Sequence, residues 1–199
     1  MYKFGQIEIA SKKFNSGYEV PSTVDVSKIR ISDGIMVNKH DVRFMIGYEK
    51  TPGEIVPLYM KTPKNCRSSG VSRYNETSPW KMGFNVSEDE DWVKLWKSIW
   101  EGIEEALSVK LSGNPLNNGK YINPKLMVWD EDIKTRFNPC NRPEGPCEAT
   151  GVLKISSIYC QANNNYLQVF LKECKYTKRD TSFESMLSSD EDEGYDTVF

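Results

Sequence analysis

Apolar residues in the first half of the chain recur in short runs separated by polar turns, a pattern typical of β-strands. Two runs rich in Ile, Val, Met and Phe lie within residues 28–50, on either side of the polar stretch NKHD. The stretches 54–63 (EIVPLYMKTP) and 79–86 (PWKMGFNV) predict a third and a fourth strand. Pro57 favours an edge position or an irregular start for the third strand, because proline cannot donate a ladder hydrogen bond.

The apolar spacing changes from two residues to three and four between Ser87 and Leu111. Ser87 and Glu90 match a capping box, so we predict that the helix starts at Ser87. Because aliphatic residues share the stripe with the tryptophans, we interpret it as a face that packs on a sheet and not as a ligand platform. The stripe consists of Trp92, Leu95, Trp96, Ile99, Ile103, Ala106 and Leu107.

Strand-like runs return after the helix, at residues 125–129, 151–161 and 166–176, and the last two are joined by ANNN, a hairpin signal. Strands on both sides of a single long helix predict a mainly β fold. A small Greek-key barrel of the oligonucleotide-binding (OB) type, with the long amphipathic helix inserted between strands, fits this order. An open α+β sheet fits the pattern as well.

Composition divides the chain into a body and a tail. The 199 residues are 38% hydrophobic, which suits one domain over residues 1–178. Residues 180–199 hold seven carboxylates and no Lys or Arg, so we expect 179–199 to be a disordered acidic tail. Without those seven acids the 26 basic and 28 acidic side chains leave the body at +5. A basic body with an acidic appendage is a weak indication of nucleic-acid binding.

Motifs for catalysis are lacking in the sequence. The one histidine, His40, lies in a polar turn, and no GxSxG, P-loop or HExxH occurs. Five cysteines include Cys140 and Cys147 in a proline-rich loop, which we interpret as idle thiols because no CxxC or paired histidine accompanies them. We therefore expect no enzyme, no cofactor and no metal site. With no signal-peptide pattern or membrane-length apolar run, we expect a cytosolic or nuclear protein that does not engage membranes.

Basic and aromatic residues alternate between residues 58 and 81. Cations that follow phosphates, together with rings that stack on unpaired bases, are the means by which proteins hold single-stranded nucleic acid. The alternative is that Tyr59 and Trp80 point into the core and that the loop between them is only solvated. The predicted contacts are Tyr59, Lys61, Lys64, Arg67, Arg73, Tyr74 and Trp80, with Lys81 beside them and a weaker set on the hairpin, Lys154, Tyr159, Tyr166, Lys172 and Lys175.

Several blocks of the sequence resemble a protein family of algal giant viruses and related large DNA viruses. The most specific are KTPKN-x-x-x-x-GVSRYN and FNVSE-x-x-x-W, and GKYINPKLMVWDEDIKTRFNPC, ATGVLKISSIYCQ and LQVFLKECKY extend the resemblance over roughly residues 1–178. That family is similar in layout to viral and phage single-stranded DNA-binding proteins. The resemblance implies an OB barrel, an acidic tail closed by Phe and no catalytic residues. Arg67-Ser68-Ser69-Gly70 departs from it, because an aromatic residue expected there is absent.

The tail then has two interpretations. It is a solubilising segment, or it competes with DNA for the basic surface and, once displaced, recruits viral replication proteins through its apolar end. The predicted partner-binding residues are Asp190, Glu191, Asp192, Glu193, Asp196 and Phe199. For the whole protein, the alternative to single-stranded DNA binding is a virion or interaction scaffold that uses the barrel structurally. Monomer and homodimer both stay open, and the expected location is the viral replication site in host cytoplasm or nucleus, or the virion.

Overall fold

The computed structural model describes residues 2–11, 13–126, 143–162 and 164–178. The predicted tail, residues 127–129 of one predicted strand, and Cys140 lie outside this part of the chain. Within it, the helical elements are η1 (Val26–Lys28) and α1 (Glu90–Leu107). The strands are β1 (Glu8–Ile9), β2 (Ile29–Ile31), β3 (Ile35–Met36), β4 (Asp41–Thr51), β5 (Glu54–Lys61), β6 (Cys66–Ser72), β7 (Lys81–Met82), β8 (Phe84–Asn85), β9 (Leu116–Asn117), β10 (Tyr121–Ile122), β11 (Lys125–Leu126), β12 (Glu144–Gln161) and β13 (Asn164–Lys178).

Five strands close into a barrel. Going round it, β12 pairs with β13, β13 with β11, β11 with β7, β7 with β6, and β6 again with β12. The β11–β13 pair is parallel and the others are antiparallel. The prediction of a mainly β fold with a barrel and one long helix is confirmed, and the barrel is closed.

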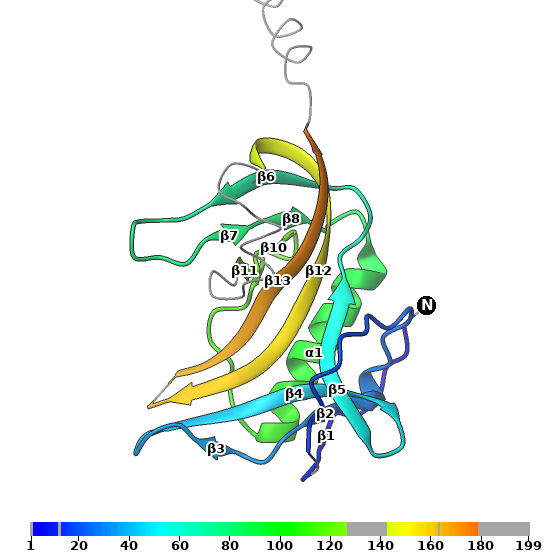
Figure 1. The fold of residues 1–199 in the computed structure, drawn as a ribbon, viewed down its shortest axis with the longest axis vertical. Helices are drawn as coiled ribbons and strands as arrows, with labels where there is room; N and C mark the ends of the chain where they lie inside the picture. The colour runs from blue at the N-terminus through cyan, green and yellow to red at the C-terminus, as the bar shows by residue number, and fades with distance from the viewer. Residues whose placement is uncertain (1, 12, 127–142, 163, 179–199) are drawn as a thin grey trace, which may run out of the picture.

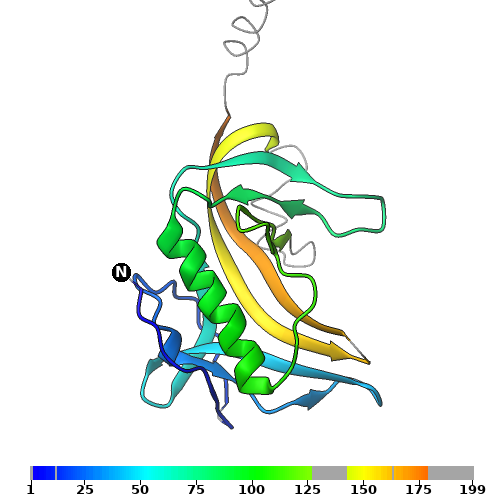
Figure 2. The same cartoon turned by 180° about the vertical axis from the view of Figure 1, so that it is seen from behind.

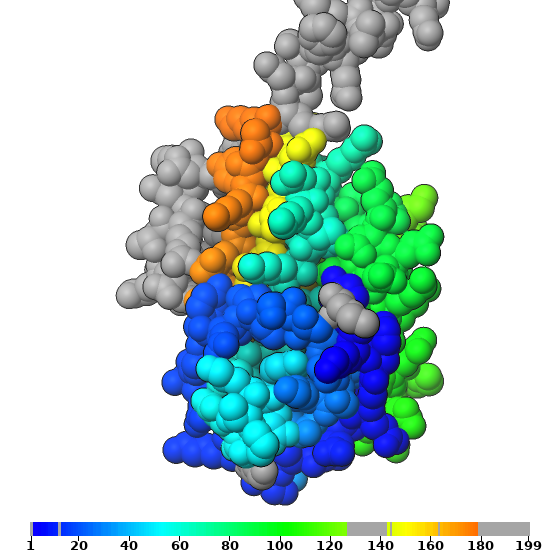
Figure 3. All heavy atoms as spheres, turned by 90° about the vertical axis from the view of Figure 1, so that its right-hand side faces the viewer, coloured from blue at the N-terminus to red at the C-terminus, as the bar shows by residue number. Residues whose placement is uncertain are grey.

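A second group of strands extends the sheet beyond the barrel. The 18-residue β12 pairs with β6 through its first half and with β4 and β5 through its second half, while β2, β1 and β3 continue outward from β4. Figure 1 shows β12 and β13 as two long, curved strands that lie side by side and join the two groups, and Figure 3 shows the N-terminal strands gathered at one end of the molecule. Pro57 does not mark an edge: β5 pairs with β4 up to Pro57 and with β12 from Leu58 onward.

The helix α1 begins two residues later than predicted. Asp89 is its N-cap and its carboxylate accepts the Trp92 N–H at 2.9 Å, whereas the Ser87 hydroxyl donates to Asn85 at 2.7 Å. The helix ends at Leu107, where Ser108 adopts the left-handed conformation with φ of 52°. Ser87 and Asp89 are both residues that favour the N-cap position and lie two positions apart, so the sequence spacing alone does not distinguish them.

The predicted apolar stripe of α1 forms the centre of the core. Trp92, Leu95, Trp96, Ile99 and Ile103 are all buried and pack with residues of the sheet. Two indole N–H groups are satisfied inside the protein, Trp92 by the carbonyl of Lys61 at 2.8 Å and Trp96 by the Asn114 side chain at 3.1 Å. In Figure 2, α1 lies along the sheet beside β12. The helix therefore has a structural role. Among the described residues no helix is both long and apolar enough to cross a membrane.

One strand of the barrel forms where the sequence predicts a loop. In β6, residues 66–70 alternate between buried and exposed positions, but apart from Cys66 they are small polar residues, Gly and Arg. These residues lack the branched apolar signature of strands, and the pairing with β12 holds them extended. Gly70 has φ of 87°, and a Cβ there would lie 2.5 Å from the carbonyl oxygen of Pro143, so only glycine fits this close approach.

Candidate nucleic-acid interface

A groove crosses the barrel between the β6–β7 loop and the start of β13. It consists of two hollows of about 360 and 400 Å³ that share Lys81 and Asn123 as lining residues. In Figure 1, the β6–β7 loop and the tip of the β12–β13 hairpin project to the same side of the molecule. The groove is lined, among others, by Arg73, Tyr74, Lys81, Asn123, Lys125 and Tyr166.

Positive charge gathers in this groove without a carboxylate among the lining residues that the structure describes. Lys81 and Lys125 are cross-strand partners on β7 and β11, so their side chains leave the same face of the sheet. Burial, and secondarily the charge of Lys81, lower the pKa of Lys125 below its ordinary value. An anion bound between the two ammonium groups offsets both effects, because its negative charge favours the protonated form of Lys125, so this pair is suited to a phosphate.

Aromatic rings stand at both ends of the groove. Tyr74, in the β6–β7 loop, is 95% exposed, and Tyr166, at the start of β13, is 38% exposed. The Arg73 guanidinium lies 4.6 Å from the centre of the Trp80 ring, and this contact orients the cation at the base of the loop. Exposed rings that flank a row of cations are the arrangement that unpaired bases and their phosphates require.

The β6–β7 loop is ordered by its own hydrogen bonds. The Asn75 side-chain oxygen accepts the N–H groups of Thr77 and Ser78, at 3.2 and 2.8 Å, and the hydroxyls of both residues. Arg73 donates to the carbonyl of Glu76 at 3.1 Å. Because these bonds fix the turn around it, the neighbouring Tyr74 is presented to solvent without a large entropic cost on binding.

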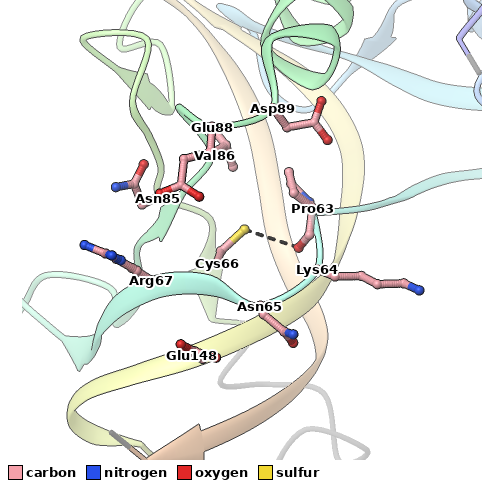
Figure 4. Close-up of a pocket in the computed structure, with 10 residues that line it drawn as sticks. All are labelled: Pro63, Lys64, Asn65, Cys66, Arg67, Asn85, Val86, Glu88, Asp89 and Glu148. Atoms are coloured by element: carbon pink, nitrogen blue, oxygen red, sulfur yellow. Dashed lines mark hydrogen bonds between the residues drawn. The ribbon is translucent and has the colours of Figure 1, made fainter.

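Four other predicted cations, Lys61, Lys64, Arg67 and Lys175, line a different hollow, which we call the Lys64 cleft. It consists of two hollows of about 430 and 900 Å³ between the β5–β6 turn, the start of α1 and β12, and Figure 4 shows the residues that line the smaller one. Four cations and four carboxylates line it, so its net charge is near zero. They are Lys61, Lys64, Arg67 and Lys175, with Glu88, Asp89, Glu148 and Glu173. Burial raises the pKa of Cys66 in this cleft to about 11, which leaves its thiol protonated and unreactive at neutral pH.

Three further predicted contacts lie outside both hollows. Tyr59 is 4% exposed and its ring packs edge-on against Tyr18 at 4.7 Å, so it has no open face for a base, contrary to the prediction. The alternative interpretation, that this ring belongs to the interior, describes Tyr59 correctly. Lys154 is half-buried on β12, opposite Tyr59. Tyr159 is also half-buried and donates its hydroxyl to Asp41 at 2.6 Å.

The structure thus brings together a set that differs from the predicted one. Arg73 and Tyr74 from the basic and aromatic stretch line the groove with Lys81, and Trp80 contacts Arg73. The predicted contacts Lys61, Lys64 and Arg67 do not line the groove. The sequence did not point to Lys125, because this residue begins an apolar run that predicts a strand and nothing more. The pairing of β11 with β7 is what places it beside Lys81.

The acidic tail residues, Asp190, Glu191, Asp192, Glu193, Asp196 and Phe199, lie outside the described residues. Among the described residues, no group of three or more His, Cys, Asp or Glu side chains has the geometry of a metal site. No protein-family model matches the chain, and no curated protein matches it.

Proposed function

We propose that this protein binds single-stranded DNA with little sequence preference and without catalysing a reaction. The observation that carries the proposal is the groove, in which three cations and two exposed rings meet with no carboxylate among the described lining residues. Cations hold the phosphates of any sequence, and every base has a face that a tyrosine ring can cover.

The order of the barrel strands supports an OB-type barrel. In chain order the five barrel strands are β6, β7, β11, β12 and β13. Around the barrel their order is β6, β7, β11, β13 and β12, and β12 pairs again with β6. OB barrels bind oligonucleotides across their second and third strands, between the loop joining strands one and two and the loop joining strands four and five. Here those strands are β7 and β11, which carry Lys81 and Lys125. The groove thus coincides with the surface that such a barrel uses. One difference is that α1 lies between the second and third barrel strands.

The resemblance to a family of large DNA viruses suggests where this binding acts. We infer that the protein coats single strands during viral DNA replication, recombination and repair, in host cytoplasm or nucleus. The acidic tail competes with DNA for the cations of the groove and recruits replication partners when DNA displaces it. Cutting the chain after Thr181 should therefore tighten DNA binding and abolish partner recruitment. Unchanged affinity in the truncated protein argues against the competition.

The test of this function is fluorescence anisotropy with labelled oligo-dT and with a duplex of the same length, each at two salt concentrations. We expect a strong preference for the single strand, with an affinity that falls by a log-log slope of about 0.7 per phosphate contacted. Absence of binding by both the full chain and the truncated chain rejects the proposal.

A second candidate is a protein-interaction scaffold or virion component. The observation that favours it is the run Ile35, Met36 and Val37 along and beyond β3, in which the side chains are 54%, 63% and 48% exposed. Exposed apolar residues on an edge strand are typical of a surface that another chain covers. Tryptophan fluorescence separates the two candidates, because DNA stacking near Trp80 quenches it and a scaffold shows no change on adding oligo-dT.

A further inference from the structure

A line of side chains continues from the groove onto the strands outside the barrel. Tyr166 on β13 pairs with Tyr159 on β12, and Tyr159 pairs with Arg43 on β4. Directly paired residues of antiparallel strands point to the same face of a sheet, so the three side chains share one face. Neighbouring strands are about 4.8 Å apart, which places the ends of this line about 10 Å from each other.

The two members beyond Tyr166 are held in place. Tyr159 donates its hydroxyl to the Asp41 carboxylate at 2.6 Å, and the Arg43 guanidinium lies 5.6 Å from the centre of the Tyr159 ring. Arg43 is exposed on the strand. A fixed ring next to a guanidinium offers one stacking surface and one planar cation, the pair that binds a nucleotide.

The charges around this pair favour an anion. Asp41, the carboxylate that Tyr159 contacts, is 5% exposed and already accepts hydrogen bonds from Tyr159 and from Asn38. These two bonds, Tyr159 first, lower the pKa of Asp41, so its charge is satisfied by neutral donors. The adjoining turn exposes Lys39 and His40. Along this edge, the exposed charged groups from the β3–β4 turn to Arg43 are Lys39 and Arg43 itself, and both are basic.

The line is continuous with the groove through Tyr166, which belongs to both. Figures 1 and 2 both show the tip of the β12–β13 hairpin next to the start of β4. A single strand of DNA that leaves the groove at Tyr166 contacts Tyr159 next and then Arg43.

We propose that Tyr166, Tyr159 and Arg43 form a platform that binds the nucleotides of a single strand that extend beyond the groove. This inference rests on the proposed function. The strands outside the barrel then have a binding role in addition to a structural one. An oligonucleotide that fills only the groove does not reach Arg43, and a longer one does.

The test compares oligo-dT of about 6 and of about 16 nucleotides, lengths near the two ends of the range that one OB barrel accommodates. We expect Arg43→Ala to weaken binding of the longer oligonucleotide about three- to tenfold and to leave the shorter one unchanged, with a larger loss for Arg43→Glu. Tyr166→Ala should weaken both lengths. Lys97→Ala, which removes an exposed cation from α1, is the control and should change neither.

Two results overturn the platform, namely no loss for the longer oligonucleotide in either Arg43 variant, or equal losses for both lengths. In these cases the wild-type protein still binds the short oligonucleotide, so the groove stands. Failure of the wild-type protein to bind either length rejects the proposed function itself. Because Arg43 is exposed, we expect both variants to fold, and thermal melting checks this.

Discussion

The groove and the Lys64 cleft are both lined by residues of the stretch 58–81, but they differ in the balance of positive and negative charge. Arg67 lies at the start of β6 and Arg73 immediately after its end, so the two arginines are six positions apart in the same basic and aromatic stretch. Arg67 is paired across the sheet with Glu148 of β12, and its cleft holds as many carboxylates as cations. Arg73 enters a groove whose described lining lacks carboxylates. The density of basic residues along the chain therefore does not determine the electrostatic potential of the folded surface, because the neighbouring strands contribute charged residues of their own.

The largest single-residue effect that we expect is at Tyr74. Because this ring is 95% exposed, Tyr74→Ala should leave the melting temperature unchanged and weaken oligo-dT binding by about 1 to 3 kcal/mol, the contribution of one stacked base. Tyr121→Ala is the matched control, since that ring is 44% exposed on β10 and lines neither the groove nor the Lys64 cleft. Equal losses in the two variants would show that tyrosine content, and not the groove, governs affinity.

A smaller effect should appear in the pH dependence of binding. The pKa of Lys125 is lowered in the free protein, so as pH rises this residue loses its proton before an ordinary lysine does. Bound phosphate favours the charged form, so DNA affinity should start to fall below the ordinary lysine pKa, by the equivalent of one phosphate contact. Anisotropy between about pH 7.5 and pH 10 measures this. Lys125→Arg should remove the early fall, since arginine stays charged over this range. A wild-type curve identical to that of Lys125→Arg contradicts the assignment.

The smallest effect on DNA binding is expected at Asp89, where a substitution should change the stability of the protein but not its affinity for DNA. Asp89→Ala removes the N-cap of α1 and should lower the free energy of unfolding by about 1 kcal/mol, whereas Ser87→Ala should cost less. The same substitution removes a carboxylate from the Lys64 cleft. If the cleft bound DNA, affinity would rise. We expect the DNA affinity to stay the same. Chemical denaturation measures the free energy of unfolding, and anisotropy measures the affinity.

The helix and most strands were predictable because their signals are local. The residues of the apolar stripe from Trp92 to Ile103 recur at helical spacing, and all of them are buried on the face of α1 that packs against the sheet. The strand β6 was not predictable, since its small polar residues are held extended only by β12. In the same way, Arg73 and Tyr74 are visible in the sequence as basic and aromatic neighbours. Lys125 joins Lys81 only through the pairing of β11 with β7, 44 positions apart in the chain.

The most direct test of the account neutralises the two regions in parallel. One protein carries Arg73→Ala and Lys81→Ala in the groove, the other Lys64→Ala and Arg67→Ala in the Lys64 cleft, so each loses one arginine and one lysine. Anisotropy with oligo-dT over a salt series gives affinity and slope for both. We predict that the groove variant loses about 1.4 from the log-log slope, the share of two phosphate contacts, with the cleft variant close to wild type. Equal losses in both variants, or a larger loss from the cleft, would contradict the assignment of the binding site to the groove.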